Sequence, residues 1–281
     1  MLIYVLFYGS DLMKYIIDSD YHIHSKQSFC SRDELQTPQN ILEASKKDGF
    51  KEICLTDHFW DEYVKGIEGL SLEQNFKNIS KNLPLPDDND VKFMFGCETD
   101  LDKRFVLGVS PQNYDKFDFI IIATTHLHLN GFTVEGNEDN EERAKLYVDR
   151  IKAVLDMDLP FKKIGFAHLT TSHITRGKKD SGKYSHLDVI NLVSDSTFRE
   201  LFNRIADKGS GVELNFDLDY YETEESRERS LRPYRIAKEC GCKFYFGSDA
   251  HHPKSFENRR IRFEKAVNAL NLTQNDKFRI G

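Results

Sequence analysis

The sequence predicts an α/β fold built from parallel β/α units, of the barrel type. Short apolar segments alternate with amphipathic helical patterns along the chain, which is typical of parallel β/α units. The length of 281 residues is also close to the about 250 residues of a (β/α) barrel. In addition, most of the apolar segments run directly into a histidine or an acidic residue. Because barrels place their chemistry at the C-terminal ends of the strands, we expect a site there.

The first half of the chain is predicted to hold four strands. Residues 15–17 form a short buried strand with His22 and His24 at its C-terminal end. Thr37 followed by Pro38 is typical of the N-cap and first residue of a helix, and this helix ends near residue 49. The other elements predicted here are strands at 52–56, 91–95 and 117–123, a helix at 71–83 and a small hairpin at 100–110.

The second half continues the alternation with three more strands. The loop at 170–183 is rich in Thr, Ser, Gly and Lys, and it is too long and polar to be a simple connection. We therefore expect it to contribute to the site. The elements predicted here are strands at 163–167, 211–216 and 243–246 and helices at 144–155, 187–208, 225–239 and 256–272.

The composition excludes several classes of protein. Charged residues make up 30% and hydrophobic residues 39% of the chain, as in soluble globular proteins. The balance of 39 Lys and Arg against 46 Asp and Glu gives a net charge of −7, which argues against broad binding to nucleic acids or anionic membranes. The five scattered cysteines form no disulfide framework, so we expect a reducing, cytoplasmic compartment.

The N-terminus is apolar but short. Its first eight residues cannot span a membrane, and they lack the basic region and cleavage site of a signal peptide. We predict that residues 1–13 are an N-terminal extension and that residues 14–281 form one barrel domain. An additional edge strand would also fit the apolar residues at the start.

The segment 20–24 contains two histidines, His22 and His24, spaced so that both leave a strand from the same face. A metal ion between them is one interpretation, and a surface His-x-His pair is the other. The remaining strands favour the metal, because six of the seven end in a residue that can bind one. These residues are His22 with His24, His58, Glu98, His126, His168, and Asp249 with His251.

This set of ligands predicts the kind of metal centre. Imidazole nitrogens and carboxylate oxygens suit Zn²⁺, Mn²⁺ or Fe²⁺ at a catalytic site. Eight ligands are too many for one ion, so we expect two or three divalent metal ions with Glu98 as the bridging ligand. A centre of this kind activates water and neutralises phosphoryl oxygens, which is the chemistry that hydrolyses phosphate esters.

These residues also carry a resemblance to a known family. Asp20-x-His22-x-His24, Thr56-Asp57-His58, Gly96-x-Glu98, Thr125-His126, Ala167-His168 and Ser248-Asp249-Ala250-His251 resemble the ordered motifs of the PHP (polymerase and histidinol phosphatase) superfamily. The resemblance implies a distorted (β/α)7 TIM-like barrel with a trinuclear metal site. The implied ligands are His22, His24, Glu98 and Asp249 for one metal, Glu98, His126 and His168 for a second, and His58 and His251 for a third.

The sequence departs from the family pattern at Cys30. Members usually supply the third metal with a further His or Asp at this position, six residues after the second histidine of the first motif. Cys30 can ligate zinc as a thiolate, Asp33 can substitute for it, or the third site can be weak or empty. We favour Cys30 as the ligand.

Candidate substrate-binding residues lie outside the metal motifs. Arg176 with Lys178 or Lys179 is expected to bind the phosphate through charge-assisted hydrogen bonds, although a solvated basic loop is the alternative. Asp249 or His128 is the candidate acid for the leaving group. Weaker candidates for ligand contacts are Arg32, Arg104 and Asn215, and His252 has no assigned role.

The function predicted from these observations is a metal-dependent phosphoesterase. It would hydrolyse a small phosphate monoester, with histidinol phosphate as the leading substrate, by a hydroxide that bridges the metals. The alternatives are a phosphodiesterase or exonuclease on nucleotides or short oligonucleotides, and a non-catalytic metal-binding partner subunit. We expect a small-molecule substrate, no stable nucleic-acid complex and no membrane association.

Overall fold

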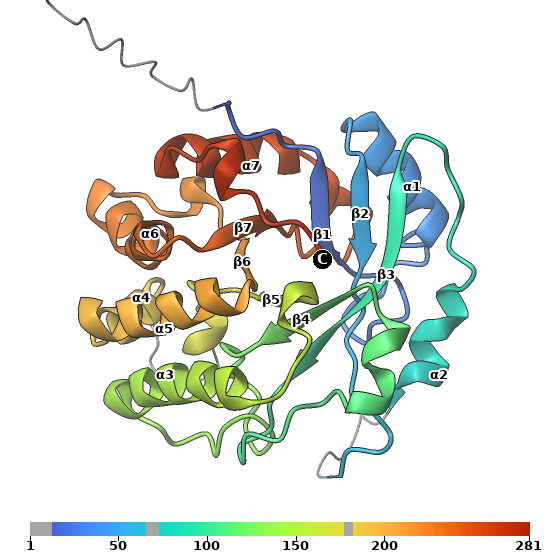
Figure 1. The fold of residues 1–281 in the computed structure, drawn as a ribbon. Helices are drawn as coiled ribbons and strands as arrows, with labels where there is room; N and C mark the ends of the chain where they lie inside the picture. Colours follow the sequence, from blue (N-terminus) through green and yellow to red (C-terminus); the bar gives the residue numbers. More distant parts are fainter. Residues whose placement is uncertain (1–12, 66–72, 177–181) are drawn as a thin grey trace, which may run out of the picture.

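A computed structural model describes residues 13–65, 73–176 and 182–281. Seven parallel strands form a nearly closed barrel in which each strand pairs with the next one along the chain (Figure 1). The strands are β1 Ser19–Ile23, β2 Glu52–Leu55, β3 Lys92–Asp100, β4 Phe119–Ala123, β5 Ile164–Phe166, β6 Gly211–Leu214 and β7 Lys243–Phe246. The fold is therefore a TIM-like (β/α)7 barrel, as the sequence predicts.

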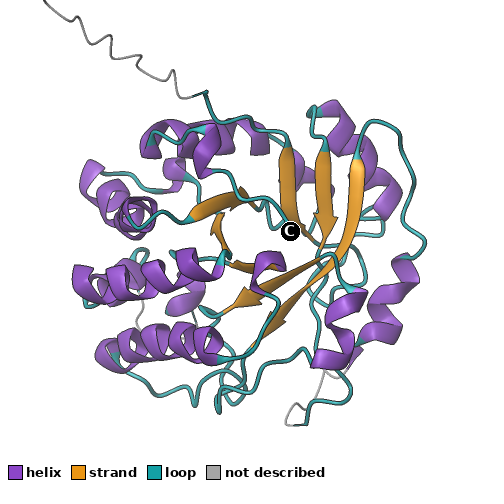
Figure 2. Cartoon of the chain, in the orientation of Figure 1, coloured by secondary structure: helices purple, strands orange, loops and turns teal. Residues whose placement is uncertain are grey.

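Helices surround the barrel on the outside (Figure 2). The α-helices are α1 Pro38–Lys47, α2 Phe76–Ile79, α3 Asn140–Asp156, α4 Ser185–Asn191, α5 Asp195–Lys208, α6 Glu224–Glu239 and α7 Arg259–Leu270. The short 3-10 helices are η2 Ser80–Asn82, η3 Pro111–Lys116, η4 Phe161–Lys163, η5 Ser172–Ile174, η6 Leu218–Tyr220, η7 Pro253–Phe256 and η8 Gln274–Asp276. No helix among the described residues is both long and apolar enough to cross a membrane.

The barrel closes between its first and last strands. Ile23 forms a parallel bridge with Ala250, which lies just after β7. The backbone N–H of His24 donates to the carbonyl of Ala250 at 3.0 Å, and the N–H of Asp249 donates to the carbonyl of His22 at 2.8 Å. The closure therefore uses the residues that carry the first and last sequence motifs, and it brings them side by side.

The barrel interior is filled with aromatic and apolar side chains at its amino end. One buried cluster consists of Tyr21, Cys54, Met94, Phe119, Ile121, Ala167, Tyr245 and Phe278. Phe278 belongs to the C-terminal segment, which lies at the centre of the barrel in Figure 1, and its N–H donates to the carbonyl of Phe244 at 2.8 Å. Phe278 therefore covers the amino end of the barrel, where β7 begins.

A bulge in β1 positions the first histidine. Asp20 pairs with Ile53 and Ile23 pairs with Leu55, so three steps in β1 match two in β2. Neighbouring residues of a regular strand point to opposite faces, yet Tyr21 packs in the barrel interior and His22 also faces inward, toward the carboxyl-end cluster. The extra residue turns the strand so that both side chains face inward.

Several predicted elements differ from the structure. The first strand is Ser19–Ile23 rather than residues 15–17. Its pairing with β2 begins at Ser19, directly after Asp18, whose carbonyl accepts hydrogen bonds from the N–H groups of residues 51 and 52. His22 thus lies within the strand. The predicted hairpin at 100–110 is reduced to a single antiparallel bridge between Leu101 and Leu107.

The predicted helices fare unevenly. α1 is confirmed with Thr37 as its N-cap and Pro38 in its first turn. The single helix predicted at 187–208 is two helices, α4 and α5, because Ser194 caps the second helix by accepting a hydrogen bond from the N–H of Thr197 at 3.1 Å. Of the helix predicted at 71–83, the described part contains α2 and η2. Residues 71 and 72 lie outside the described residues, as do residues 1–12 of the extension predicted at 1–13.

Candidate metal centre

Glu98 lies at the centre of the carboxyl end of the barrel. Both of its oxygens are buried and have no hydrogen-bond partner among the described residues. Imidazole nitrogens surround them: His58 Nδ1 at 2.9 Å, His24 Nε2 at 3.4 Å and His22 Nε2 at 3.5 Å from Oε2, and His168 Nε2 at 3.6 Å and His126 Nε2 at 3.9 Å from Oε1. The two oxygens therefore face two different groups of histidines, which is the geometry that a bridging carboxylate needs.

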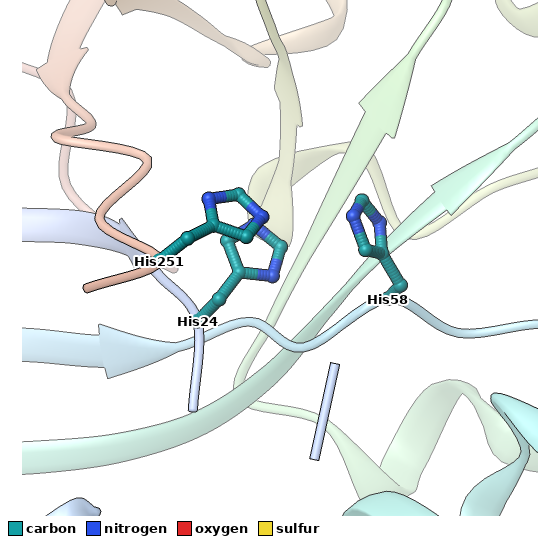
Figure 3. Close-up of side chains that lie close together, drawn as sticks. All are labelled: His24, His58 and His251. Atoms are coloured by element: carbon teal, nitrogen blue, oxygen red, sulfur yellow. The ribbon is translucent and has the colours of Figure 1, made fainter. Parts of the chain in front are cut away.

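The candidate ligand atoms form overlapping groups, and the atoms within one group all lie within 4.8 Å of one another. Three groups combine the predicted ligands: His24, His58 and His251; His22, His24 and Asp249; and Glu98, His126 and His168. Figure 3 shows the first of these groups, in which the rings of His24 and His251 stack at 4.0 Å. A fourth group adds Glu213 to His22 and His168. The structure thus brings together the predicted ligands from all six strand ends.

Asp249 and His168 adopt backbone conformations that few residues tolerate. Their φ angles are +53° and +56°, in the left-handed region that is costly for side chains other than glycine. This conformation carries the Asp249 carboxylate to 3.1 Å from His24 Nε2 and 3.6 Å from His168 Nε2. Strain of this kind is concentrated at functional sites, where the surrounding structure holds it in place.

Hydrogen bonds at the back of the imidazoles orient the candidate ligands. His22 Nδ1 donates to Glu213 at 2.5 Å, and His126 Nδ1 donates to Asp100 at 2.9 Å. His24 Nδ1 lies 3.0 Å from Ser28 Oγ, which itself donates to Asp57. In each case Nε2 is left facing the cluster. Outer partners of this kind fix the tautomer and orientation of metal-binding histidines.

These observations test whether a metal fits the site. Buried acceptor atoms without donors, an all-nitrogen and oxygen set, and carboxylates behind the imidazoles are the features of a catalytic centre for Zn²⁺, Mn²⁺ or Fe²⁺. Close packing supports the same arrangement, since a Cβ on Gly247 would collide with the Glu213 carboxylate behind His22. The residues present fit a divalent metal centre.

Electrostatics hold the metal-free cluster in a charged state. Burial disfavours the charged form of every member, but the mutual attraction is larger. His58 and His22 lower the pKa of Glu98 well below its usual value. Glu213, Asp249 and Glu98 raise the pKa of His22 well above its usual value, and Glu98 does the same for the pKa of His58. Protons on imidazoles thus balance the buried carboxylates when no metal is bound.

The structure distinguishes the candidates for the third metal. Cys30 lines the same cavity as His58 and is among the groups that raise the pKa of His58. Asp33 instead forms an ion pair with His252 at 2.9 Å. Cys30 therefore faces the same cavity as His58 and His251, whereas Asp33 is paired with His252. His252, which had no assigned role, holds Asp33. Whether Cys30 binds a metal stays a prediction.

A cavity of about 940 Å³ opens above the cluster, which is large enough for a small ligand. One face of it consists of His128, His173 and Arg176. The rings of His128 and His173 stack at 4.3 Å, and His173 Nε2 accepts a hydrogen bond from Arg176 Nη1 at 3.3 Å. Burial, followed by the charges of neighbouring groups such as His126, lowers the pKa of both histidines to about 3. Both rings are therefore neutral near pH 7.

The other candidate substrate residues are distributed differently. Lys178 and Lys179 lie outside the described residues. Arg104 is held by Asp102 at 2.7 Å, and Asn215 donates to the carbonyl of Gly247 at 2.9 Å, so both have partners away from the cavity. Arg32 is exposed and is not among the described residues that line the cavity.

Three residues of the site were not identified from the sequence. Asp100 lies on the same face of β3 as Glu98, because the two residues are two positions apart in the strand. This period of two is visible in the sequence. Glu213 lies in β6, two residues before the candidate Asn215. His173 lies in η5, in the polar loop after β5, where no periodicity indicates which residue faces the cavity.

The fold and this cluster define a (β/α)7 barrel with a candidate multinuclear metal centre at its carboxyl end. The chain belongs to the PHP domain family, whose model matches residues 20–217. The match ends before Asp249 and His251, which the barrel closure returns to the side of His24. The predicted family membership is therefore confirmed.

Two of the similar solved structures come from bacteria. Histidinol phosphate phosphatase (HisK) of Lactococcus lactis subsp. lactis Il1403, complexed with zinc, L-histidinol and phosphate, is 21% identical with a TM-score of 0.57 over 89% of this chain and 93% of that one. A candidate histidinol phosphatase, HisK, of Listeria monocytogenes is 15% identical with a TM-score of 0.59 over 85% of this chain and 97% of that one. At these identities the likeness shows the fold. Among curated proteins, none matches this chain.

Proposed function

We propose that this protein is a metal-dependent phosphomonoesterase that acts on a small phosphate ester. The observation that carries the proposal is the position of Glu98, whose two buried oxygens face two groups of imidazoles. Membership of the PHP domain family and the likeness to a histidinol phosphate phosphatase support hydrolysis of phosphoester bonds. Histidinol phosphate is the first substrate to test.

Two or three divalent ions are proposed at the site. They would be held by His22, His24, Glu98 and Asp249, by Glu98, His126 and His168, and by His58, His251 and Cys30, which line the same cavity. Zinc is the first metal to test because the Lactococcus lactis structure contains it, with manganese and iron as alternatives. Such ions supply an activated water and neutralise the charge on phosphoryl oxygens.

The residues of the chain itself have three proposed tasks. Arg176 binds the phosphate with its guanidinium, and His173 orients it by accepting one of its hydrogen bonds. Lys178 is proposed as a second phosphate contact. His128 and Asp249 are the proposed groups that exchange a proton with the leaving oxygen, and both line the cavity. All five cysteines are free thiols, which supports a reducing, cytoplasmic location.

The experiment is a phosphate-release assay on protein loaded separately with Zn²⁺, Mn²⁺ and Fe²⁺, with the bound metal measured by elemental analysis of the same samples. The substrates are histidinol phosphate, a panel of sugar and nucleotide monoesters, and matched diesters. Release from monoesters that depends on metal, with two or more ions bound per chain, is the expected result. No release from any ester by a fully metallated sample would overturn the proposal.

The same assay separates the alternatives. Hydrolysis confined to diesters would indicate a phosphodiesterase or nuclease instead. A protein that binds the metals but hydrolyses neither class would be a metal-binding partner subunit. Among monoesters, a preference for histidinol phosphate over sugar phosphates would support the first substrate, and equal rates would reject it.

A further inference from the structure

Arg143 of α3 is a buried cation outside the candidate metal centre. Its guanidinium is enclosed, with 1% of the residue exposed. Nη1 donates to two backbone carbonyls, those of Leu127 and Ile174, the latter at 2.8 Å. Nε donates to the carbonyl of Glu138 at 3.3 Å, and Nη2 lies 3.5 Å from the Glu138 carboxylate. A buried guanidinium is costly unless it is hydrogen-bonded in this way.

The two carbonyls belong to the two segments that build one face of the cavity. Leu127 lies between His126 and His128, just after β4. Ile174 lies between His173 and Arg176, in the segment that follows β5. Neither segment is held in the sheet, since β4 ends at Ala123 and β5 ends at Phe166. One nitrogen of Arg143 therefore joins these two segments.

The face that results depends on this connection. The rings of His128 and His173 come from different segments and stack at 4.3 Å with an interplanar angle of 29°. Arg176 in turn is bonded to His173 at 3.3 Å. If the two segments separate, the stack opens and Arg176 loses the orientation that His173 gives it, while Glu98 and His22 stay anchored in β3 and β1.

We propose that Arg143 is a positioning residue that joins the segments after β4 and β5 and so holds His128, His173 and Arg176 in the geometry that binds the phosphate group. The proposal rests on the proposed function for the identity of the ligand. The joining of the two segments is a separate statement, and it can be measured without turnover.

Arg150 of the same helix provides a matched control. It lies two helical turns after Arg143, is equally buried, and like Arg143 donates to backbone carbonyls, including those of Thr124 at 2.8 Å and Leu101 at 2.9 Å. These partners follow β4 and β3, and none of the carbonyls that it contacts belongs to the segment after β5. Loss of either arginine removes a buried guanidinium, but only Arg143 reaches Ile174.

The test compares Arg143→Lys with Arg150→Lys. A lysine cannot reproduce the two-carbonyl contact, because its ammonium lacks the planar fork of donors. We expect Arg143→Lys to weaken the binding of inorganic phosphate by about tenfold or more when the variant and the wild type are compared at the same bound metal per chain. Hydrogen exchange should accelerate in both segments, 126–130 and 171–176. Arg150→Lys should leave phosphate affinity within about twofold and exchange at 171–176 unchanged.

The outcomes separate the two levels of the proposal. Equal loss of phosphate affinity in both variants, or unchanged exchange at 171–176 in Arg143→Lys, would overturn the positioning role. A wild-type protein that bound no phosphate would overturn the proposed function, whereas the exchange result would still decide whether Arg143 joins the segments. If Arg143→Lys does not fold, Glu138→Gln decides instead, because it retains Arg143 and removes the charge of its carboxylate partner. Faster exchange in both segments then supports the proposal, and unchanged exchange overturns it.

Discussion

The two ends of the barrel interior are filled in opposite ways. At the amino end, the rings of Phe119 and Tyr245 meet edge to face at 5.1 Å, and Phe278 covers them from the C-terminal segment. At the carboxyl end, buried carboxylates and imidazoles occupy the same interior, with Glu98 at the centre. The first arrangement stabilises the fold by burying apolar surface, and the second stores buried charge.

The two ends of the barrel therefore differ in what they contribute, one to stability and the other to metal binding. Apolar packing at the amino end requires nothing from outside the chain. The carboxyl end contains buried carboxylates, and the positive charges of protonated imidazoles balance them in the absence of metal ions. We therefore expect changes at the amino end to affect stability, and changes at the carboxyl end to affect metal binding and activity.

Replacement of the central carboxylate should have the largest effect. Glu98→Gln keeps the shape of the side chain and removes the charge that faces both groups of imidazoles. Loss of an outer partner already costs 10- to 100-fold in metal affinity or activity. Loss of this inner ligand should therefore reduce phosphate release by more than about 1,000-fold, together with bound metal in elemental analysis. Glu52→Gln at the amino end, where Glu52 accepts a hydrogen bond from Tyr21, is the matched control and should retain both.

Truncation of the aromatic cover should produce the largest change in stability. Phe278 is 2% exposed, and Phe278→Ala should lower the free energy of unfolding by about 3 to 5 kcal/mol, as measured by urea denaturation. The surface variant Ile261→Ala is the control, because Ile261 is 49% exposed. The contrast between the barrel ends would fail if Phe278→Ala removed bound metal from a protein that is still folded.

Replacement of the carboxylate of Glu213, which orients His22, should have an intermediate effect on metal affinity. Glu213→Gln weakens the hydrogen bond to His22 Nδ1 and the contact with the N–H of His168. Metal affinity should fall by about 10- to 100-fold while the fold is retained, as titration with a metal-sensitive dye can show. Asn215→Ala, two residues further along the chain, should change metal affinity by less than about threefold. Equal effects of the two variants would remove Glu213 from the support of the site.

The smallest predicted effect is a pH dependence of the stabilisation by metal. The raised pKa values of His22 and His58 stabilise the metal-free fold below their usual value of 6.5, and this contribution is lost as the pH rises through them. The lowered pKa values of Glu98 and Asp249 stabilise the fold above their usual values of 4.5 and 3.8. The cluster therefore stabilises the metal-free protein most between about pH 4.5 and 6.5.

Metal binding follows the opposite trend above this range, because it requires deprotonated imidazoles. The rise in Tm on adding Zn²⁺ or Mn²⁺ should therefore be several degrees larger at pH 8 than at pH 6 in a thermal-shift assay. Glu98→Gln should show a small rise at both pH values. A larger rise at pH 6 than at pH 8 in the wild type would contradict the proposed ligands.

The residues at the carboxyl end are predictable from the sequence for a local reason. His58, His126 and His168 each follow an apolar segment within a few residues, so the strand pattern alone brings them to one end of the barrel. The choice of Glu98 as the centre also follows, since its strand lies between those of His58 and His126. Local patterns thus suffice where the ligand is part of a strand or lies directly after one.

Other features depend on contacts that are remote in the sequence. Glu213 meets His22 across 191 residues, and no local pattern around either residue indicates the pair. The neighbour of His173, Ile174, accepts a hydrogen bond from Arg143. Arg143 lies in α3, which precedes β5, so the sequence around His173 does not reveal this contact. The break between α4 and α5 was missed because its residues continue the helical apolar pattern, although Ser194 is a good N-cap.

The most direct test of the central claim is the anomalous scattering of zinc in crystals grown from zinc-loaded protein. We predict at least two anomalous peaks at the carboxyl end of the barrel, each within coordination distance of a different oxygen of Glu98. A map with peaks only at surface residues, or with one peak that does not contact Glu98, would contradict the assignment of this cluster as a bridged metal centre.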